Sequence, residues 1–557
     1  MSDWLYNAGI VGLVNALQFN KDKVEITNNS VKIDVSVLDN FEDKYFNYLS
    51  HKYLVFTSWH RIADFQKKID DFKEKDSYTQ DDVDIINKYI EFLKTKLYSK
   101  SYVKAYDHIE DKDVDLIKES KDLKKISKKK KETFDDIKEL IDAQILSIEK
   151  IIEFMHKPSV KKHLVAKDLT YTLISNFWSD RSFLHKTKSD ANIFEEFNDY
   201  FVSGISEYSV EDKSKAKFSC FNCDGKINKL NNSHTLTWLQ NIGADGNKKA
   251  SHFWGLNRDD YICPICNLVY CCIPLGFVFL KGNGFFINNN FTVKTLLDSN
   301  NYALKSDSRI LELEYKSYAK IVDSFSNYEI ERIENEINNI QIVKLNVNNS
   351  FRPYAFNILS KDMIAFLHKN SKKLKFLLDK RILWYIDSSD KKHYIYLYKE
   401  TVDRMYKNEN LFSLIGFSLN KIVRGEYYGL EEVQILLSIN NDFLKGGDSM
   451  DSNMNSKKIY RIRCLGNELK RNYEKRGASN KINGISYKLL NAIKVKDKSK
   501  FLDTLINAYA YLGIEIPTVF LDCLGNDTIF QTVGYAFMLG LMGEKSNTIN
   551  KGDDASE

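Results

Sequence analysis

Two short stretches, Cys220-Phe221-Asn222-Cys223-Asp224-Gly225 and Cys263-Pro264-Ile265-Cys266-Asn267, each carry two cysteines separated by two residues. One Cys-x-x-Cys turn supplies two thiolates from a short loop, and two such turns complete the tetrahedral set of four ligands that zinc takes in structural sites. The pattern therefore predicts a structural Zn²⁺ ion bound by Cys220, Cys223, Cys263 and Cys266. Because four thiolates leave no open coordination position, it predicts no zinc catalysis.

The backbone after each pair must turn sharply, and we expect Gly225 and Asn267 to provide these turns. The interval between the pairs, residues 224–262, exceeds the roughly 15–20 residues of a zinc ribbon, which indicates an inserted segment. His234 and His252 are alternative ligands, although a structural role is favoured for each.

The alternative to a metal site is a set of reduced cysteines in a hydrophobic core. The adjacent Cys271 and Cys272 fit this alternative better than the two pairs do, because they lie in an apolar stretch that we interpret as a strand. Eight cysteines in 557 residues do not make a disulfide framework, so we expect a reducing, cytoplasmic location.

Composition indicates an α+β multidomain protein that is mainly helical. The chain is 43% hydrophobic and 28% charged, has a net charge of +5, and contains only five prolines, which favours long helices. The longest apolar run, residues 268–280, includes Pro274 and falls short of the roughly 20 residues that span a bilayer. No membrane association is therefore expected.

Four domains are predicted along the chain. The first begins with an apolar helix and a pair of short strands around a turn at Asn28-Asn29. The third opens with strands at 276–280 and 285–287, joined by a hairpin containing Asn283-Gly284. A small polar linker, residues 446–455, precedes the last domain, which is a helical bundle. The domains are 1–210 (mixed, then helical), 215–275 (zinc module), 276–445 (α+β) and 456–557 (basic, helical).

Positive charge is concentrated in the last domain. Between Lys457 and Lys500 only Glu468, Glu474 and Asp497 oppose the basic residues. Phosphate backbone is the natural partner of such a stretch. The predicted nucleic-acid contacts here are Lys457, Lys458, Arg461, Arg463, Lys470, Arg471, Lys475 and Arg476.

Tyrosines are interleaved with these cations and could stack on bases, but a core position is favoured for Tyr460, Tyr473 and Tyr487. A second cationic stretch, residues 121–131, has two open interpretations: a solvated loop, or a contact to nucleic-acid backbone.

The sequence lacks the common enzyme motifs. The sequence has no phosphate-binding loop, no Gly-x-Ser-x-Gly elbow and no His-Glu-x-x-His motif. This lowers the expectation of catalysis.

The opening stretch Trp4-Leu5-Tyr6-Asn7-Ala8-Gly9-Ile10-Val11-Gly12-Leu13, taken with the two cysteine pairs, resembles a CRISPR family. It is similar to the Cys-x-x-Cys/Cys-x-x-Cys large subunit of type I-B Cascade, and this resemblance implies that the opening motif lies at the structural core. It also implies a non-catalytic member of an RNA-guided antiviral surveillance complex, which reads a motif flanking the target, stabilises the R-loop and helps to recruit a helicase-nuclease.

The implied partners are a guide RNA complex with its backbone and other Cascade subunits, target double-stranded DNA with its displaced strand, and the helicase-nuclease. For reading the flanking motif, the first candidates are four donors in the insert, namely Lys248, Lys249, Asn257 and Arg258. The alternative is that this loop is ordinary surface.

The family also implies that the last domain can be made alone as a small subunit from an internal start. Lys445-Gly446-Gly447-Asp448 can be encoded by a purine-rich ribosome-binding sequence just before Met450, with Met454 as the fallback start. Copies of this fragment would then be a further partner. The alternative is a flexible Gly-Gly linker with a chance methionine.

Two other functions compete with a Cascade subunit. The main one is a zinc-stabilised nuclease acting on its own, whose site is too dispersed to recognise in one sequence. The other is a scaffold that binds no nucleic acid. Its sign would be the absence of salt-sensitive binding to DNA or RNA.

Overall fold

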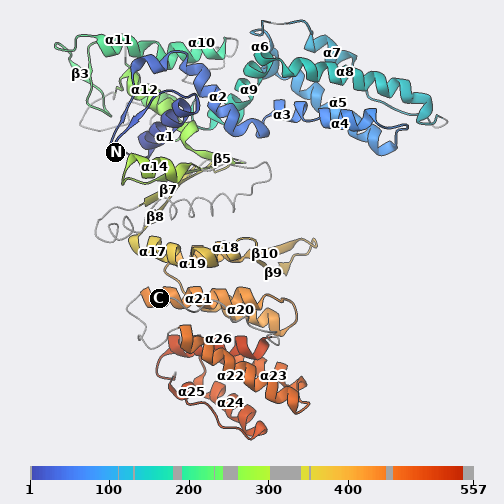
Figure 1. Ribbon diagram of the computed structural model, residues 1–557, viewed down its shortest axis with the longest axis vertical. Coiled ribbons are helices and arrows are strands. Elements are labelled where there is room, and N and C mark those ends of the chain that lie inside the picture. Colours follow the sequence, from blue (N-terminus) through green and yellow to red (C-terminus); the bar gives the residue numbers. More distant parts are fainter. Residues whose placement is uncertain are drawn as a thin grey trace. The chain divides into compact units, whose positions relative to one another are not determined.

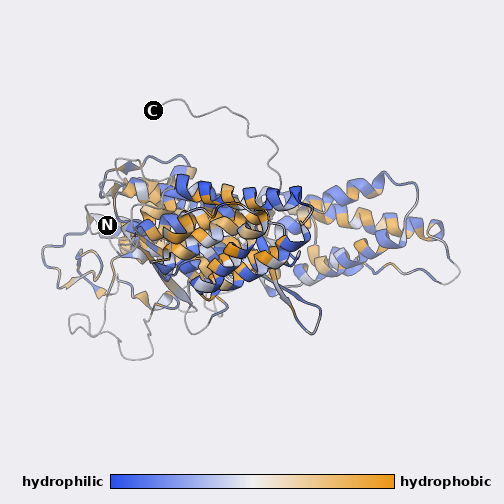
Figure 2. Cartoon of the chain, turned by 90° about the horizontal axis from the view of Figure 1, so that it is seen from below, coloured by the Kyte–Doolittle hydropathy of each residue, from blue (hydrophilic) through white to orange (hydrophobic). Residues whose placement is uncertain are grey.

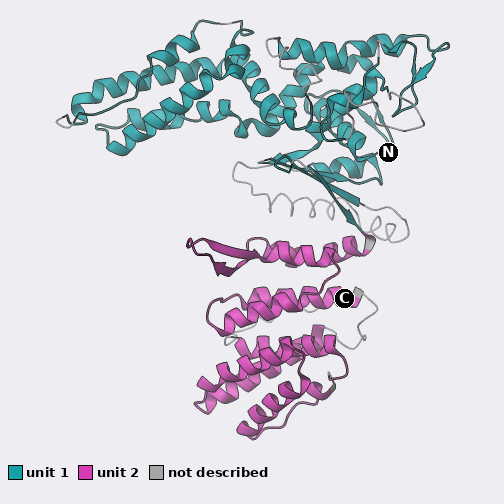
Figure 3. Ribbon diagram, turned by 180° about the vertical axis from the view of Figure 1, so that it is seen from behind, with its two compact units in different colours: residues 1–329, 335–359 teal, residues 330–334, 360–557 magenta. Residues whose placement is uncertain are grey.

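The computed structural model describes residues 3–110, 112–129, 132–179, 191–230, 233–242, 261–280, 282–301, 340–349, 353–446, 456–522 and 524–543. The chain divides into two compact units, shown in different colours in Figure 3. Unit 1 comprises residues 1–329 and 335–359, and unit 2 comprises residues 330–334 and 360–557.

Helices make up most of unit 1 (Figure 1). Its α-helices are α1 (Trp4–Phe19), α2 (Phe41–Tyr53), α3 (Ser58–Ala63), α4 (Gln66–Lys73), α5 (Gln80–Leu97), α6 (Lys100–Tyr106), α7 (Leu116–Asp122), α8 (Lys138–His156), α9 (Pro158–Thr172), α10 (Ile193–Phe197), α11 (Gly204–Val210), α12 (Pro264–Cys271), α13 (Ile273–Gly276) and α14 (Val293–Asn300). Short 3₁₀ or π turns are η1 (Val35–Leu38), η2 (Leu54–Phe56), η3 (Asp135–Ile137), η4 (Ile174–Asn176), η6 (Asn198–Val202) and η8 (Leu236–Trp238).

The N-terminal motif forms α1, which begins where the Asp3 carboxylate accepts hydrogen bonds from the backbone N–H groups of Leu5 and Tyr6. Two glycines bring this helix against α12 and α13 backbone to backbone. A Cβ on Gly9 would collide with the carbonyl oxygen of Val269, and one on Gly12 with that of Cys272. The opening motif thus packs directly on the helices that follow the second cysteine pair.

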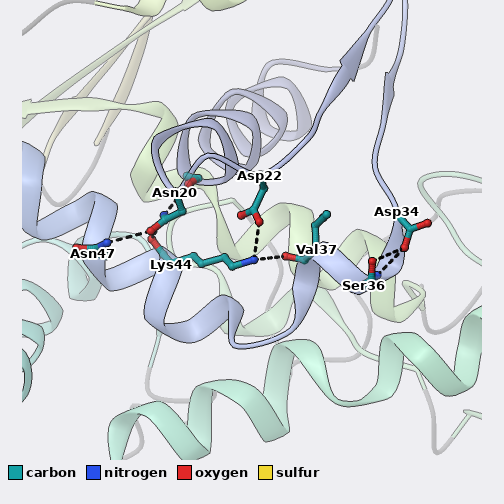
Figure 4. A network of polar contacts seen from close by, with 8 residues as sticks. Asn20, Asp22, Asp34, Ser36, Val37, Lys44 and Asn47 are labelled. Atoms are coloured by element: carbon teal, nitrogen blue, oxygen red, sulfur yellow. Dashed lines mark hydrogen bonds and ion pairs between the residues drawn. The ribbon is translucent and has the colours of Figure 1, made fainter.

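Polar contacts fix the end of α1 against α2 (Figure 4). Lys44 Nζ donates to Asp22 Oδ1 at 2.9 Å and to the Val37 carbonyl at 2.7 Å. Asn20 Nδ2 donates to the Lys44 carbonyl at 3.1 Å, and Asn47 Nδ2 donates to Asn20 Oδ1 at 2.9 Å. These hydrogen bonds join the C-terminal end of α1 to α2.

Unit 1 also contains a four-stranded antiparallel sheet in the order β5 (Val278–Leu280), β6 (Asn283–Asn288), β7 (Ile340–Asn346) and β8 (Tyr354–Leu359). The predicted hairpin of β5 and β6 is confirmed, but its turn is not at Asn283-Gly284. Leu280 pairs with Asn283, so the turn comes before Asn283 and includes Gly282, which has a φ of +79°. The strand pair predicted around Asn28-Asn29 is present as β1 (Glu25–Ile26) and β2 (Val31–Lys32).

Unit 2 combines helices with one two-stranded sheet. The strands are β9 (Arg381–Ile386) and β10 (Lys392–Tyr396). The helices are α17 (Lys361–Lys369), α18 (Ser371–Leu377), α19 (Leu397–Tyr406), α20 (Phe412–Val423), α21 (Leu430–Gly446), α22 (Ser456–Lys475), α23 (Asn480–Lys494), α24 (Lys498–Leu512), α25 (Val519–Asp522) and α26 (Asp527–Met542).

The C-terminal bundle depends on a second close helix pair, α22 with α26. A Cβ on Gly466 would collide with the Phe537 carbonyl oxygen, and one on Gly540 with that of Arg463. The solvent side of α22 is hydrophilic, whereas its buried positions include Ile462, Leu469 and Tyr473. Figure 2 shows hydrophilic and hydrophobic residues alternating along the helices, as amphipathic helices require.

The fold class is therefore the predicted one: a mainly helical, multidomain α+β protein with a cysteine module at mid-chain and a helical C-terminal bundle. The strand predicted for Cys271 and Cys272 is wrong. Cys271 ends α12 and Cys272 lies between α12 and α13, and both are fully buried. The segment is helical because a Pro at the first turn of each helix favours helical geometry there. Among the described residues, no helix combines the length and the apolarity that crossing a membrane requires.

Candidate metal centre and basic surface

The first cysteine pair lies in the turn between β3 (Phe218–Ser219) and β4 (Lys226–Ile227). Cys220 N–H donates to the Gly225 carbonyl at 2.8 Å, which closes the turn. Gly225 lies in this turn, and the left-handed residue beside it is Asp224, with a φ of 58°. A Cβ on Gly225 would lie 2.8 Å from the Tyr208 hydroxyl and 3.1 Å from Cys223 Sγ, so a larger residue there would displace the end of the Tyr208 side chain.

The second pair begins α12. Cys263 is the N-cap residue, and its Sγ accepts from the Cys266 N–H at 3.5 Å. Pro264 occupies the first turn, where a missing N–H costs nothing. Asn267 does not provide a turn, contrary to the prediction. It is a buried helical residue. Its side-chain Oδ1 accepts a hydrogen bond from Trp238 Nε1 at 3.0 Å, and its Nδ2 donates to the Tyr200 carbonyl at 3.1 Å.

The four sulfur atoms of these cysteines come together, all within 4.8 Å of one another. Cys223 Sγ and Cys263 Sγ are 3.7 Å apart. Four thiolates around a zinc ion at about 2.3 Å would have sulfur–sulfur separations of about 3.8 Å, whereas a disulfide brings sulfurs to about 2.05 Å. The spacing therefore suits four ligands around one metal ion and does not suit disulfides.

The pKa shifts of the four thiols favour the binding of a cation between them. The thiol groups of Cys223, Cys263 and Cys266 surround Cys220 and hold its pKa far below the ordinary value. Interaction with Cys220 and Cys223 has the opposite effect on Cys266, whose pKa is raised. One thiolate forms readily, but further ones repel it, so complete ionisation needs a positive ion at the centre.

Side chains other than the four cysteines also reach the sulfur group. Asn222 Nδ2 lies 3.5 Å from Cys266 Sγ, and the Tyr6 hydroxyl lies 3.8 Å from the same sulfur. Burial, followed by the charge of Cys266, raises the pKa of Tyr6, so this hydroxyl stays protonated. Sequence reasoning missed Tyr6 as a site residue, although it lies within the opening motif.

The histidines are not part of this group. His234 is half-buried and pairs in an isolated bridge with Ile262, and loss of solvation lowers its pKa to about 4. Among the residues that the structure describes, the only group able to hold a metal ion consists of the four cysteines. His252 lies outside the described residues, as do the four predicted DNA contacts Lys248, Lys249, Asn257 and Arg258.

The predicted cations of α22 differ in their surroundings. One side of the helix, in steps of three or four residues, exposes Lys457, Arg461, Cys464, Glu468, Arg471 and Lys475. Lys458, Arg463 and Lys470 are half-buried. The exposed cations therefore form two groups at the ends of the helix, separated by one carboxylate.

Two of the predicted cations bind helix ends. Lys470 Nζ donates to the Gly543 carbonyl at 2.7 Å, where α26 ends. Arg476 donates from its two terminal nitrogens to the carbonyls of Tyr511 and Leu512 at 2.5 and 2.6 Å, where α24 ends. Both satisfy orphan carbonyls at helix C-termini.

The interleaved tyrosines are only partly as predicted. Tyr473 is a core residue whose hydroxyl donates to the Ala508 carbonyl. Tyr460 and Tyr487 are 53% and 47% exposed, so the core position favoured for them is wrong. Both fall on the exposed side of their helices, although Tyr460 also lines a pocket with residues of α21 and α26.

The lysine-rich segment after α7 is hydrogen-bonded to side chains of α5 and α8. Buried Leu123 and Ile126 anchor it, and Ile126 N–H donates to Asn87 Oδ1 at 2.7 Å. Lys124, Lys125, Lys128 and Lys129 are exposed. The contact of this segment with nucleic acid stays a prediction.

The cysteine module carries the one match found to a known family. Residues 213–278, which contain both cysteine pairs, α12 and α13, match the family model described as "CRISPR-associated protein (Cas_CXXC_CXXC)". No curated protein and no solved structure matched the chain significantly. The match supports a CRISPR-associated protein, and the segment that carries the paired cysteines is what is similar to this family.

Proposed function

We propose that this protein is the non-catalytic large subunit of a type I-B Cascade, an RNA-guided antiviral surveillance complex. The observation that carries the proposal is the match of residues 213–278 to the CRISPR-associated family at the four grouped cysteines. The subunit would read a DNA motif flanking the target, stabilise the R-loop and help to recruit a helicase-nuclease.

In this proposal the ion is Zn²⁺, with a structural role. Four thiolates at tetrahedral spacing are the ligand set of structural zinc, and they leave no position for a reacting water. Metal analysis of protein purified without chelator tests this point, with one zinc ion per chain as the expected result.

The exposed cations of α22 support contact with a phosphate backbone. Lys457, Arg461, Arg471 and Lys475 are exposed, and none of the described carboxylates forms an ion pair with them. Replacing all four with Ala should lower both the affinity for nucleic acid and the dependence of that affinity on salt, since released counterions set the slope. Lys470 and Arg476 should be left unchanged in this variant, because they hold helix ends.

We further propose that residues 450–557 are also made alone, as a small subunit. The packing of α22 on α26 and of α23 on both α24 and α26 supports this, because it gives the fragment its own core. Both candidate starts, Met450 and Met454, lie outside the described residues. A Met450→Ala change should abolish a short product that carries a C-terminal tag.

Co-purification from the native operon, with a tag at the C-terminus of this chain, tests the function as a whole. A uniform short RNA, several neighbouring subunits and a tagged short fragment are the expected result. A bare protein that cleaves DNA when a metal ion is added would instead identify a nuclease.

A further inference from the structure

Strands β9 and β10 form a hairpin in unit 2 (Figure 1). This hairpin exposes large apolar side chains. Three adjacent residues, Trp384, Tyr385 and Ile386, are 56%, 44% and 49% exposed. By contrast, Trp178 and Trp238 are each 1% exposed. Contiguous exposed apolar surface of this kind marks a binding site.

An irregularity in the strand pairing presents Trp384. Tyr385 pairs with His393 and Leu383 pairs with Tyr394, so Trp384 has no cross-strand partner. The extra residue makes a β-bulge, a feature that bends a strand and redirects a side chain. Trp384 is therefore directed to solvent by the backbone itself.

The neighbouring rings are held in place before any ligand binds. Tyr385 stacks on His393 with centroids 4.4 Å apart and an interplanar angle of 10°, and Trp384 meets Tyr385 edge-on at 4.8 Å. His393 Nε2 lies 3.0 Å from Asp387 Oδ2, and the other oxygen of Asp387 accepts from the Ser389 N–H. Such pre-ordered rings lose little conformational entropy when they bind.

Cations accompany the rings. Arg381, Lys391 and Lys392 are exposed, and within the described part of the chain no carboxylate forms an ion pair with any of them. The Arg381 guanidinium lies over the Tyr394 ring, 4.3 Å from its centroid. Asp387 and Asp390 lie in the turn, so the net charge of the hairpin is small.

We propose that this hairpin is a stacking platform for unpaired nucleotides of a single nucleic-acid strand. Trp384 would stack on one base and Tyr385 on a second, while Arg381, Lys391 and Lys392 contact phosphates. Every base has an aromatic face, so such stacking is tolerant of sequence. The inference rests on the proposed nucleic-acid role and deepens it, because it adds a contact that depends on rings and not on net charge.

The test uses the full-length protein and a fluorescein-labelled oligothymidylate. Trp384→Ala should weaken binding about tenfold or more, because one base–aromatic stack contributes about that much. Trp384→Phe should retain most of the affinity, and Tyr428→Ala, at a residue 87% exposed in the same unit, should leave it unchanged. The slope of affinity against salt should stay the same in Trp384→Ala and fall in the Lys391→Ala, Lys392→Ala double variant.

Tryptophan fluorescence provides a second measurement. Iodide should quench the exposed Trp384 in the free protein, and the oligonucleotide should protect it. If Trp384→Ala binds as tightly as the wild type, the stacking platform is refuted while the nucleic-acid role stands. If Trp384 is protected only by an added protein subunit, the platform is likewise refuted. If the wild-type protein binds no nucleic acid at all, both proposals fail.

Discussion

Two helix pairs use the same packing device in different surroundings. In unit 1, Gly9 and Gly12 bring α1 against α12 and α13, and in unit 2, Gly466 and Gly540 bring α22 against α26. The first pair adjoins four grouped thiols. The second pair adjoins hydrogen-bonded helix ends and no grouped metal ligands among the residues described. The same close contact therefore adjoins a candidate metal site in one unit and helix ends in the other.

Removal of the metal should produce the largest difference in stability between the two helix pairs. A chelator, or Cys263→Ser, should unfold the module around α12, because binding of a structural zinc ion provides about 10–16 kcal/mol of folding free energy. Hydrogen exchange followed by mass spectrometry should show lost protection in α1 and α12 and unchanged protection in α22 and α26.

Cys464→Ser is the matched control, since Cys464 is exposed on α22 and lies outside the sulfur group. Equal loss of protection in both units on chelation would contradict the comparison. Full protection of α12 without metal would show that the four cysteines are ordinary core residues.

Glycine substitution should destabilise either pair. The Cβ of Gly540→Ala would collide with the Arg463 carbonyl oxygen, and overpacking of this kind costs about 1–3 kcal/mol. Gly484→Ala is the matched control in α23, where nothing lies within 4 Å of the added Cβ. It should stabilise the helix by about 0.5–1 kcal/mol. Urea unfolding of unit 2 measures both changes, and equal effects would refute the close contact.

A pH-dependent contribution is expected in unit 2. Burial would raise the pKa of Asp442, but the ammonium groups of Lys373 and Lys369, at 2.6 and 3.0 Å, outweigh burial and hold the pKa below its ordinary value. A lowered carboxyl pKa stabilises the fold above the unfolded value of about 3.9, and this stability is lost as pH falls through the folded pKa.

Asp442→Asn should therefore cost about 1–3 kcal/mol at neutral pH and progressively less in acid. The urea dependence of hydrogen exchange in α17, α18 and α21 measures the loss. The exposed Asp503→Asn serves as the control. A loss that is as large at pH 3 as at pH 7 would show that the ion pairs do not cause it.

The comparison also shows what sequence reasoning can reach. The four cysteines were identifiable because two ligands from one turn leave a local signature, and their grouping is confirmed. The helices α1, α5 and α8 were identifiable from the helical periodicity of their apolar residues, and they are confirmed. In each case the physical cause lies within a few neighbouring residues.

Contacts between residues that are distant in the sequence could not be predicted from it. The contact of Tyr6 with Cys266 and the bonds of Asn267 to Trp238 and Tyr200 depend on chain crossings that no local pattern encodes. Cys271 and Cys272 were placed in a strand because short apolar runs do not distinguish a strand from a buried helix.

The smallest effect is expected where α1 touches the sulfur group. Tyr6→Phe removes a hydroxyl 3.8 Å from Cys266 Sγ and leaves the packed ring, which meets Tyr270 edge-on at 5.5 Å. Groups that support metal ligands typically contribute 10–100-fold in affinity, and this long contact should lie at the low end, at roughly tenfold or less. Competition with a chromophoric chelator measures the change in zinc affinity. Tyr48→Phe should leave that affinity unchanged, since its ring packs on Phe19. An unchanged affinity in Tyr6→Phe as well would mean that α1 supports the metal module through its glycine contacts alone.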